Sequence, residues 1–115
     1  MIIKWFKPVS IYDLAFSLQR LTGIILAFYL CLHLAYLSTL SNPKLYESLI
    51  EITVSPEFLY LDAVLFLAGI YHGVNGFRII IHELGYLHKH RMEMLIFTVV
   101  LTFLVWIFSL YMVIL

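Results

Sequence analysis

The segment from Gly69 to Tyr86, GIYHGVNGFRIIIHELGY, places several ionisable side chains in an otherwise apolar part of the chain. They are His72, Arg78, His82 and Glu83. An ionisable side chain inside a membrane costs about 2.5–3.5 kcal/mol on insertion scales, so each of the four is a functional candidate. A histidine can bind a metal, an arginine can bind an anion, and a row of such groups can relay protons.

His72 lies near the middle of this segment, and on a helix of 3.6 residues per turn Gly69, Gly73 and Gly76 surround it. Glycines leave a flat surface beside the imidazole. A planar macrocycle could lie there with the ring nitrogen on its iron. Helix packing accounts for the pattern equally well, because small residues four apart let helices approach and the histidine could then hydrogen-bond to a neighbour. The residues alone leave both interpretations open.

Arg78 and His82 share a stripe with Asn75 toward the end of the segment. The forked donors of Arg78 suit an anionic group or a carbonyl oxygen, but a long side chain can also extend to the lipid headgroups. His82 could be an ordinary interfacial residue. Glu83 could pair with Arg78 or with another subunit, or lie in water.

A second polar group occurs in SLQRLTG, from Ser17 to Gly23, where Ser17, Gln19, Arg20 and Thr22 offer several donors. A lipid-soluble carbonyl compound could dock there. Arg20 could instead anchor the helix at the headgroups, and Ser17 could cap it.

His33 lies about 20 Å beyond Arg20 along a helix. It could hydrogen-bond to another helix or bind a metal, and its position does not decide between the two.

The elements that must hold these residues are membrane helices. Hydrophobic residues make up 63% of the 115 residues and charged residues 12%, and the mean hydropathy is +1.01, which is typical of a membrane protein. Three stretches have the roughly 20 apolar residues that a span needs, at about 21–40, 58–84 and 94–115. The pattern lacks the short alternating strands of a barrel. We therefore expect an all-α membrane protein with three transmembrane helices, in one membrane-anchor domain over 1–115 whose segment 1–17 lies at the interface.

Charge gives the orientation and excludes one class of partner. The formal net charge is zero, so nucleic acid is not an expected partner. Lys4, Lys7 and Arg20 precede the first span, and Lys89 and Arg91 follow the second. The positive-inside rule then predicts a multi-pass protein with its N-terminus and second loop in the cytoplasm. The third span is uncharged and apolar all round, so we expect it to pack in a heteromeric helix bundle within the lipid bilayer.

Two motifs carry a family resemblance. QRLTG resembles the signature His-Arg-hydrophobic-Ser/Thr-Gly that opens the first span of the cytochrome b-type anchor subunit of succinate dehydrogenase. HGVNGFRIIIHELGY resembles that family's second signature, in which His is followed by three residues, Gly, a hydrophobic residue, Arg, and an acidic residue five positions later. The motifs stand in the family's order, and the third span agrees, so the resemblance covers nearly the whole chain.

The resemblance implies roles for individual residues. His72 matches the axial ligand of haem b. Arg20 matches the arginine of the ubiquinone or menaquinone site, which also lies near a haem propionate, and Arg78 matches an arginine close to the propionates. Glu83 replaces the usual aspartate.

The sequence also departs from the family's pattern. Gln19 stands where the family has histidine, so an amide contact replaces an imidazole contact to a propionate. The family's serine falls at Phe16, which weakens Ser17 as a quinone ligand. His33 is an addition, and because some members hold two stacked haems, it implies a second haem toward the outer side.

The implied function is that of a membrane anchor in respiratory complex II, the succinate dehydrogenase of the tricarboxylic acid cycle, in the inner (cytoplasmic) membrane. Such an anchor works with a flavoprotein subunit, an iron–sulfur subunit and a second small membrane anchor. It passes electrons from the iron–sulfur subunit to quinone and does not oxidise succinate by itself. The second small anchor is expected to supply the other axial ligand of the haem.

Two alternatives belong to other classes. A haem-free structural anchor of a fumarate reductase-type complex would use His72 and His33 for packing. A small transport subunit would use Arg78, His82 and Glu83 as a proton relay.

Overall fold

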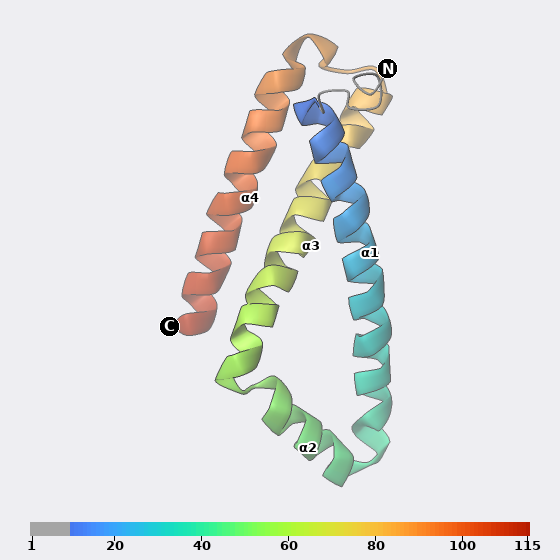
Figure 1. The fold of residues 1–115 in the computed structure, drawn as a ribbon, viewed down its shortest axis with the longest axis vertical. Coiled ribbons are helices and arrows are strands. Elements are labelled where there is room, and N and C mark those ends of the chain that lie inside the picture. Colours follow the sequence, from blue (N-terminus) through green and yellow to red (C-terminus); the bar gives the residue numbers. More distant parts are fainter. Residues whose placement is uncertain (1–9) are drawn as a thin grey trace, which may run out of the picture.

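The computed structural model describes residues 10–115, so the predictions for segment 1–9, with Lys4 and Lys7, lie outside it. Within that range there are four α-helices, two short 3₁₀ turns and no strand (Figure 1). The helices are α1 (Ile11–Ser38), α2 (Pro43–Thr53), α3 (Pro56–Glu83) and α4 (Arg91–Ile114), and the 3₁₀ turns are Thr39–Ser41 and His88–His90. α1, α3 and α4 are each part of a segment long and apolar enough to cross a membrane. The expected all-α protein with three spans is thus confirmed.

α1 begins at Ile11, ten residues before the expected first span. The hydroxyl of Ser10 accepts a hydrogen bond from the Asp13 backbone N–H at 3.1 Å, so Ser10 caps the helix and Ser17 does not. Asp13 in the first turn also complements the helix dipole. Residues 11–17 are therefore the first turns of the spanning helix and not a separate segment. At 28 residues α1 is about 42 Å long, which exceeds the hydrocarbon layer of about 30 Å.

The connection between the first two spans forms a helix of 11 residues, α2. Asn42 caps it by accepting from the Leu45 backbone N–H at 3.3 Å. Pro43 occupies the first helical position, where its missing N–H costs nothing. Tyr46 packs edge-on against Tyr36 of α1, with ring centroids 5.6 Å apart, so α2 is attached to the end of the first span (Figure 1).

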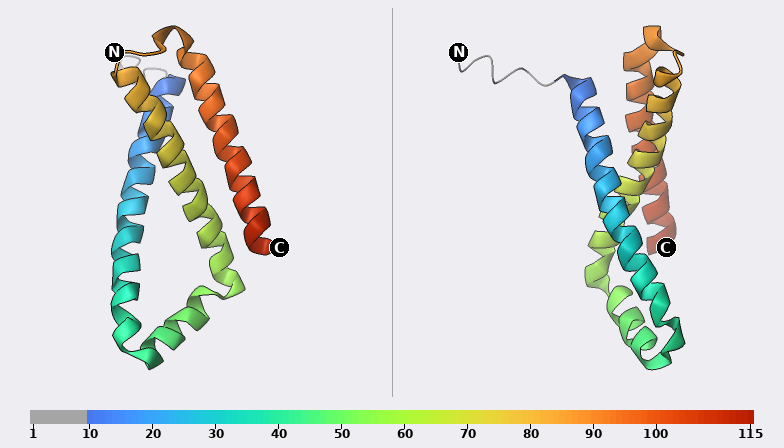
Figure 2. Two further views of the ribbon diagram at one scale, coloured as in Figure 1. Left: turned by 180° about the vertical axis from the view of Figure 1, so that it is seen from behind. Right: turned by 90° about the vertical axis from the view of Figure 1, so that its right-hand side faces the viewer.

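α3 and α4 lie side by side and run in opposite directions (Figure 2). Gly85, with φ of 91°, follows the end of α3 in the left-handed region that glycine favours. Thr98 and Thr102 of α4 are buried, and Trp106 Nε1 donates to the Ala63 carbonyl of α3 at 2.9 Å. The guanidinium of Arg91 stacks 4.3 Å from the ring centroid of Tyr12, which joins the first turns of α4 and α1.

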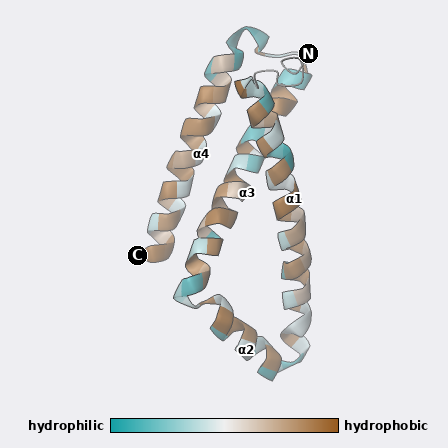
Figure 3. Ribbon diagram, viewed as in Figure 1, coloured by the Kyte–Doolittle hydropathy of each residue, from teal (hydrophilic) through white to brown (hydrophobic). Residues whose placement is uncertain are grey.

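The core of the isolated chain is small. Among residues 10–115 the buried apolar side chains are Ala15, Ala68 and Leu95. The spans expose many large apolar side chains, and α4 is apolar over most of its length (Figure 3). Lipid chains or helices of other subunits must cover these surfaces in the membrane.

The start of α1 and the connection between α3 and α4 lie at the same end of the molecule (Figures 1 and 2). Lys89 lies in this connection and Arg91 begins α4, so both lie at the end of the molecule where α1 begins.

Candidate functional site

His72 lies where α3 crosses α1, and its ring is oriented by groups of α1. Nδ1 is 3.2 Å from the Gln19 carbonyl oxygen and 3.2 Å from Thr22 Oγ1. A carbonyl oxygen only accepts, so Nδ1 carries the ring hydrogen and Nε2 carries the lone pair. No hydrogen bond joins Nε2 to any residue in 10–115. The histidine therefore makes the contact expected from helix packing and keeps one nitrogen free to act as a ligand.

Gly23 makes room for the imidazole. A Cβ atom at this position would lie 3.1 Å from His72 Cε1, closer than about nine in ten real Cβ contacts. Gly23 and Thr22 both belong to the QRLTG motif, but sequence reasoning did not connect either residue with His72. The sequence shows only that position 23 is a glycine. Which residue of another helix faces that glycine depends on how the two helices pack.

Gln19 and Asn75 form an amide pair that joins the same two helices. Asn75 is fully buried, and its Nδ2 donates to Gln19 Oε1 at 3.1 Å and to the Ala15 carbonyl at 3.4 Å. Gln19 Nε2 donates in turn to the His72 carbonyl at 3.1 Å. The glutamine side chain passes over Gly76, where a Cβ would lie 2.9 Å from Nε2.

Arg78 is buried, with 7% of its surface exposed, so it does not extend to the headgroups. Its Nε donates to Asn75 Oδ1 at 2.9 Å. It does not pair with Glu83, since the ion pair found in residues 10–115 is His90–Glu93 at 2.7 Å. The guanidinium borders a cavity of about 500 Å³ at the end of the α1–α3 crossing, whose lining residues are Tyr12, Phe16, Arg78, Ile79, His82, Glu83, His88 and Arg91.

His82 points part of its ring into the protein. Its Nδ1 is 3.2 Å from the Tyr86 carbonyl, and its ring centroid is 5.9 Å from that of His88. Nε2 is buried and has no partner in the described part of the chain. No direct hydrogen bond between residues 10–115 links His82 to Arg78 or Glu83.

Arg20, Ser17 and His33 lie apart from this cluster. Arg20 and Ser17 are exposed on α1, three residues apart and therefore on one face, which is turned away from Gln19 and Thr22. His33 is also exposed, and its ring stacks on Tyr29 with centroids 5.7 Å apart. The structure therefore brings together His72, Gln19 and Arg78, and leaves the other three candidates on outer surfaces of α1.

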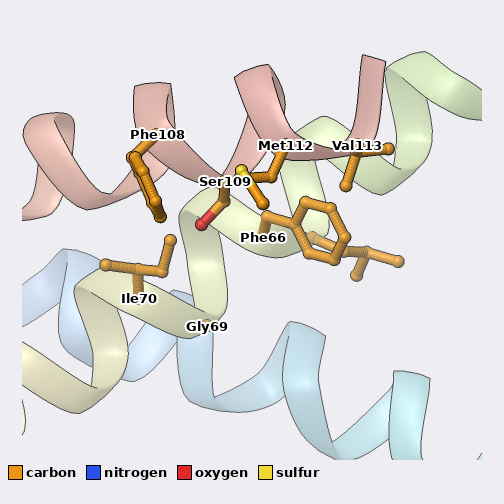
Figure 4. A pocket seen from close by; sticks show the side chains of 8 residues that line it. Phe66, Gly69, Ile70, Phe108, Ser109, Met112 and Val113 are labelled. Atoms are coloured by element: carbon orange, nitrogen blue, oxygen red, sulfur yellow. The ribbon is translucent and has the colours of Figure 1, made fainter. Parts of the chain in front are cut away.

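Two apolar grooves lie between α3 and α4. One of about 660 Å³ runs past Gly69, Gly73 and Arg78 as far as Ile81. The other, of about 500 Å³, is formed by residues such as Phe66, Phe108 and Met112 (Figure 4). Their linings suit hydrocarbon, from lipid or from a helix of another subunit.

The two glycines next to His72 give a matched test of the amide pair. We expect Gly76→Ala to leave the protein about 1 kcal/mol less stable than Gly73→Ala, because its Cβ displaces the Gln19 amide from two hydrogen bonds. Gly73 has nothing within 4 Å of an added Cβ, and both variants gain the same helix propensity. Unfolding in mixed detergent micelles measures the difference. Equal stabilities would contradict the described position of Gln19.

A metal site built from this chain's side chains alone is not present in residues 10–115, where no group of three or more His, Cys, Asp or Glu could hold an ion. A single histidine facing a cofactor is a different arrangement, and the comparisons with known proteins bear on it. A family model described as succinate dehydrogenase/fumarate reductase transmembrane subunit matches residues 10–111. No curated protein and no solved structure matches the chain. Since the match spans almost the whole sequence, the chain belongs to the family of succinate dehydrogenase/fumarate reductase transmembrane subunits.

Proposed function

We propose that this chain is the haem b-binding membrane anchor of a respiratory complex II and that His72 is an axial ligand of the haem. The supporting observation is the state of its ring, with Nδ1 directed at the Gln19 carbonyl and Nε2 without a partner in residues 10–115. Histidines that bind metals almost always donate their other ring N–H to a carbonyl or carboxylate, which fixes the tautomer and the ring orientation.

The neighbouring polar groups fit the same cofactor. Arg78 is buried and has no ion pair within residues 10–115, and a buried charge of this kind calls for an anion. A haem propionate would supply that anion. Gln19 Nε2 gives one of its two hydrogens to the His72 carbonyl, which leaves the second for a propionate oxygen.

Haem b supplies a one-electron carrier when it is bound. His72 would hold it at one axial position, and a second small anchor subunit would supply the other ligand. His33 cannot be that ligand, because it lies ten residues beyond Gly23 on α1, about 15 Å along the helix.

Arg20 and Ser17 would contribute to a quinone site on the outer face of α1. Electrons would arrive from an iron–sulfur subunit after a flavoprotein subunit has oxidised succinate. Arg20 would donate hydrogen bonds to the quinone oxygen and stabilise the negative charge that develops there. Ser17, one turn away, would add a weaker hydroxyl donor. The exposure of both side chains supports a site that partner subunits complete.

The orientation belongs to the same proposal. Arg20 near the start of α1, and Lys89 and Arg91 between α3 and α4, would face the cytoplasm across the cell membrane.

His33 is the proposed ligand of a second haem. It is exposed and makes no hydrogen bond in the described part of the chain, so its ring is free to bind. We expect about two haems per flavin in the purified complex and about one in a His33→Ala complex. One haem per flavin in both preparations would contradict the role of His33 and leave His72 as the only proposed haem ligand of this chain.

A pyridine haemochrome assay of the purified complex, related to its covalent or extracted flavin, tests the proposed function. We expect haem b to be present. A complex with flavin and iron–sulfur clusters but no haem would instead support the haem-free structural anchor, for which the hydrogen bond between His72 and α1 would be a packing contact. A chain that purifies without either partner would contradict both.

A further inference from the structure

Asn75 is the one fully buried polar side chain at the α1–α3 crossing that the proposed function leaves without a role. With 0% of its surface exposed, it lies between Arg78 on its own helix and Gln19 and Ala15 on α1. We propose that Asn75 is a positioning residue that holds the charge of Arg78 in place and thereby sets the reduction potential of the haem. This inference rests on the proposed haem at His72.

The amide of Asn75 can adopt only one orientation. Oδ1 accepts from Arg78 Nε at 2.9 Å, while Nδ2 donates to Gln19 Oε1 at 3.1 Å. A flipped amide would set its NH₂ group against the Nε–H donor and its oxygen against the Gln19 oxygen. The hydrogen-bond pattern therefore fixes both the asparagine and the guanidinium that it holds.

The same pair fixes Arg78 relative to His72. Gln19 joins Asn75 to the His72 carbonyl through its Nε2, at 3.1 Å. Arg78 follows His72 by six residues, about 9 Å along α3. The bonded set Arg78–Asn75–Gln19–His72 thus holds a positive charge at a set distance from the proposed ligand.

The position of this charge matters because a nearby cation stabilises the reduced haem, which carries one positive charge less than the oxidised form. Without the bond from Asn75, only the proposed propionate contact would restrain the long side chain of Arg78, and the guanidinium would move part of the way toward the lipid headgroups. The haem would then be harder to reduce, although Asn75 itself does not contact it.

An optical redox titration of the purified complex tests this role. We expect Asn75→Leu to retain haem and to lower the equilibrium constant for its one-electron reduction about tenfold, a fall of about 59 mV in potential. Asn75→Ala removes the same hydrogen bond to Arg78 with a smaller side chain, and it replaces the leucine variant if that variant does not assemble. Tyr71→Phe is the matched control, because it removes another bond from α3 to α1, Tyr71 Oη to the Ala15 carbonyl at 2.7 Å, but leaves the hydrogen bond between Asn75 and Arg78 in place.

A double-mutant cycle separates positioning from general loosening of the helices. In an Arg78→Gln background, Asn75→Leu is expected to produce no further shift, because the charge through which it acts is gone. An unshifted potential in Asn75→Leu and Asn75→Ala, an equal shift in Tyr71→Phe, or a shift that persists with Arg78→Gln would overturn the inference alone. A wild-type complex without haem would overturn the proposed function and this inference with it.

Discussion

Replacing His72 with alanine is expected to remove the haem that this histidine binds, so that haem per flavin falls from about two to about one. His72 Nε2 is the only group of this chain proposed to bind the iron of this haem, and the ring is held by the Gln19 carbonyl and Thr22 of α1. The reduced-minus-oxidised spectrum of the purified complex, together with a haemochrome assay, measures the loss.

The control for this variant is His88→Ala, which removes another histidine near the end of α3 that is exposed. It should retain the full spectrum. Adding imidazole to the His72→Ala complex should restore part of the haem, because the substitution leaves space of the right shape beside Gly23. A His72→Ala complex with the wild-type haem content would show that the histidine is a packing residue.

Replacing Arg20 with alanine is expected to slow quinone reduction by about 10²–10³-fold, the usual effect of removing one donor to a developing oxyanion. Arg20 is exposed and has no ion pair within residues 10–115, so its loss should not disturb the fold. Succinate oxidation measured with an artificial acceptor that takes electrons from the partner subunits should stay at the wild-type rate.

Two companion variants sharpen the test of Arg20. Ser17→Ala, one turn away on the same face, should lower quinone reduction by less than about tenfold, since a neutral donor contributes less than a charged one. Arg20→Lys keeps the positive charge but loses the forked N–H donors of the guanidinium. Its rate of quinone reduction should lie between those of the wild type and the alanine variant. A near-normal rate of quinone reduction in Arg20→Ala would contradict the proposal that Arg20 belongs to the quinone site.

The spans could be predicted from the sequence because each is a long apolar run, a property of composition that does not depend on tertiary contacts. The start of α1 and the extent of α2 could not, because local capping by Ser10 and Asn42 decides them. Both caps precede segments whose mixed polarity resembles an interfacial loop. The caps therefore begin these helices in regions where the hydropathy of the sequence does not indicate a helix.

The site could be predicted only in part. The sequence identified His72 and Arg78 because ionisable groups in a span are costly. It did not identify Asn75 as the partner of Arg78, and it suggested Glu83 instead. Opposite charge on the same helix favours Glu83 as the partner of Arg78. The observed partner, Asn75, depends instead on the rotation of α3 relative to α1. The contact between His72 and Gly23 escaped sequence reasoning for the same reason.

The most direct test of the central claim is a density map of the purified complex in its membrane or in a nanodisc, at a resolution that shows side chains. The account predicts a porphyrin whose iron is bound by His72 Nε2, while Nδ1 remains within hydrogen-bonding distance of the Gln19 carbonyl. A ring whose Nε2 touches only side chains or lipid, with no cofactor beside it, would contradict the account.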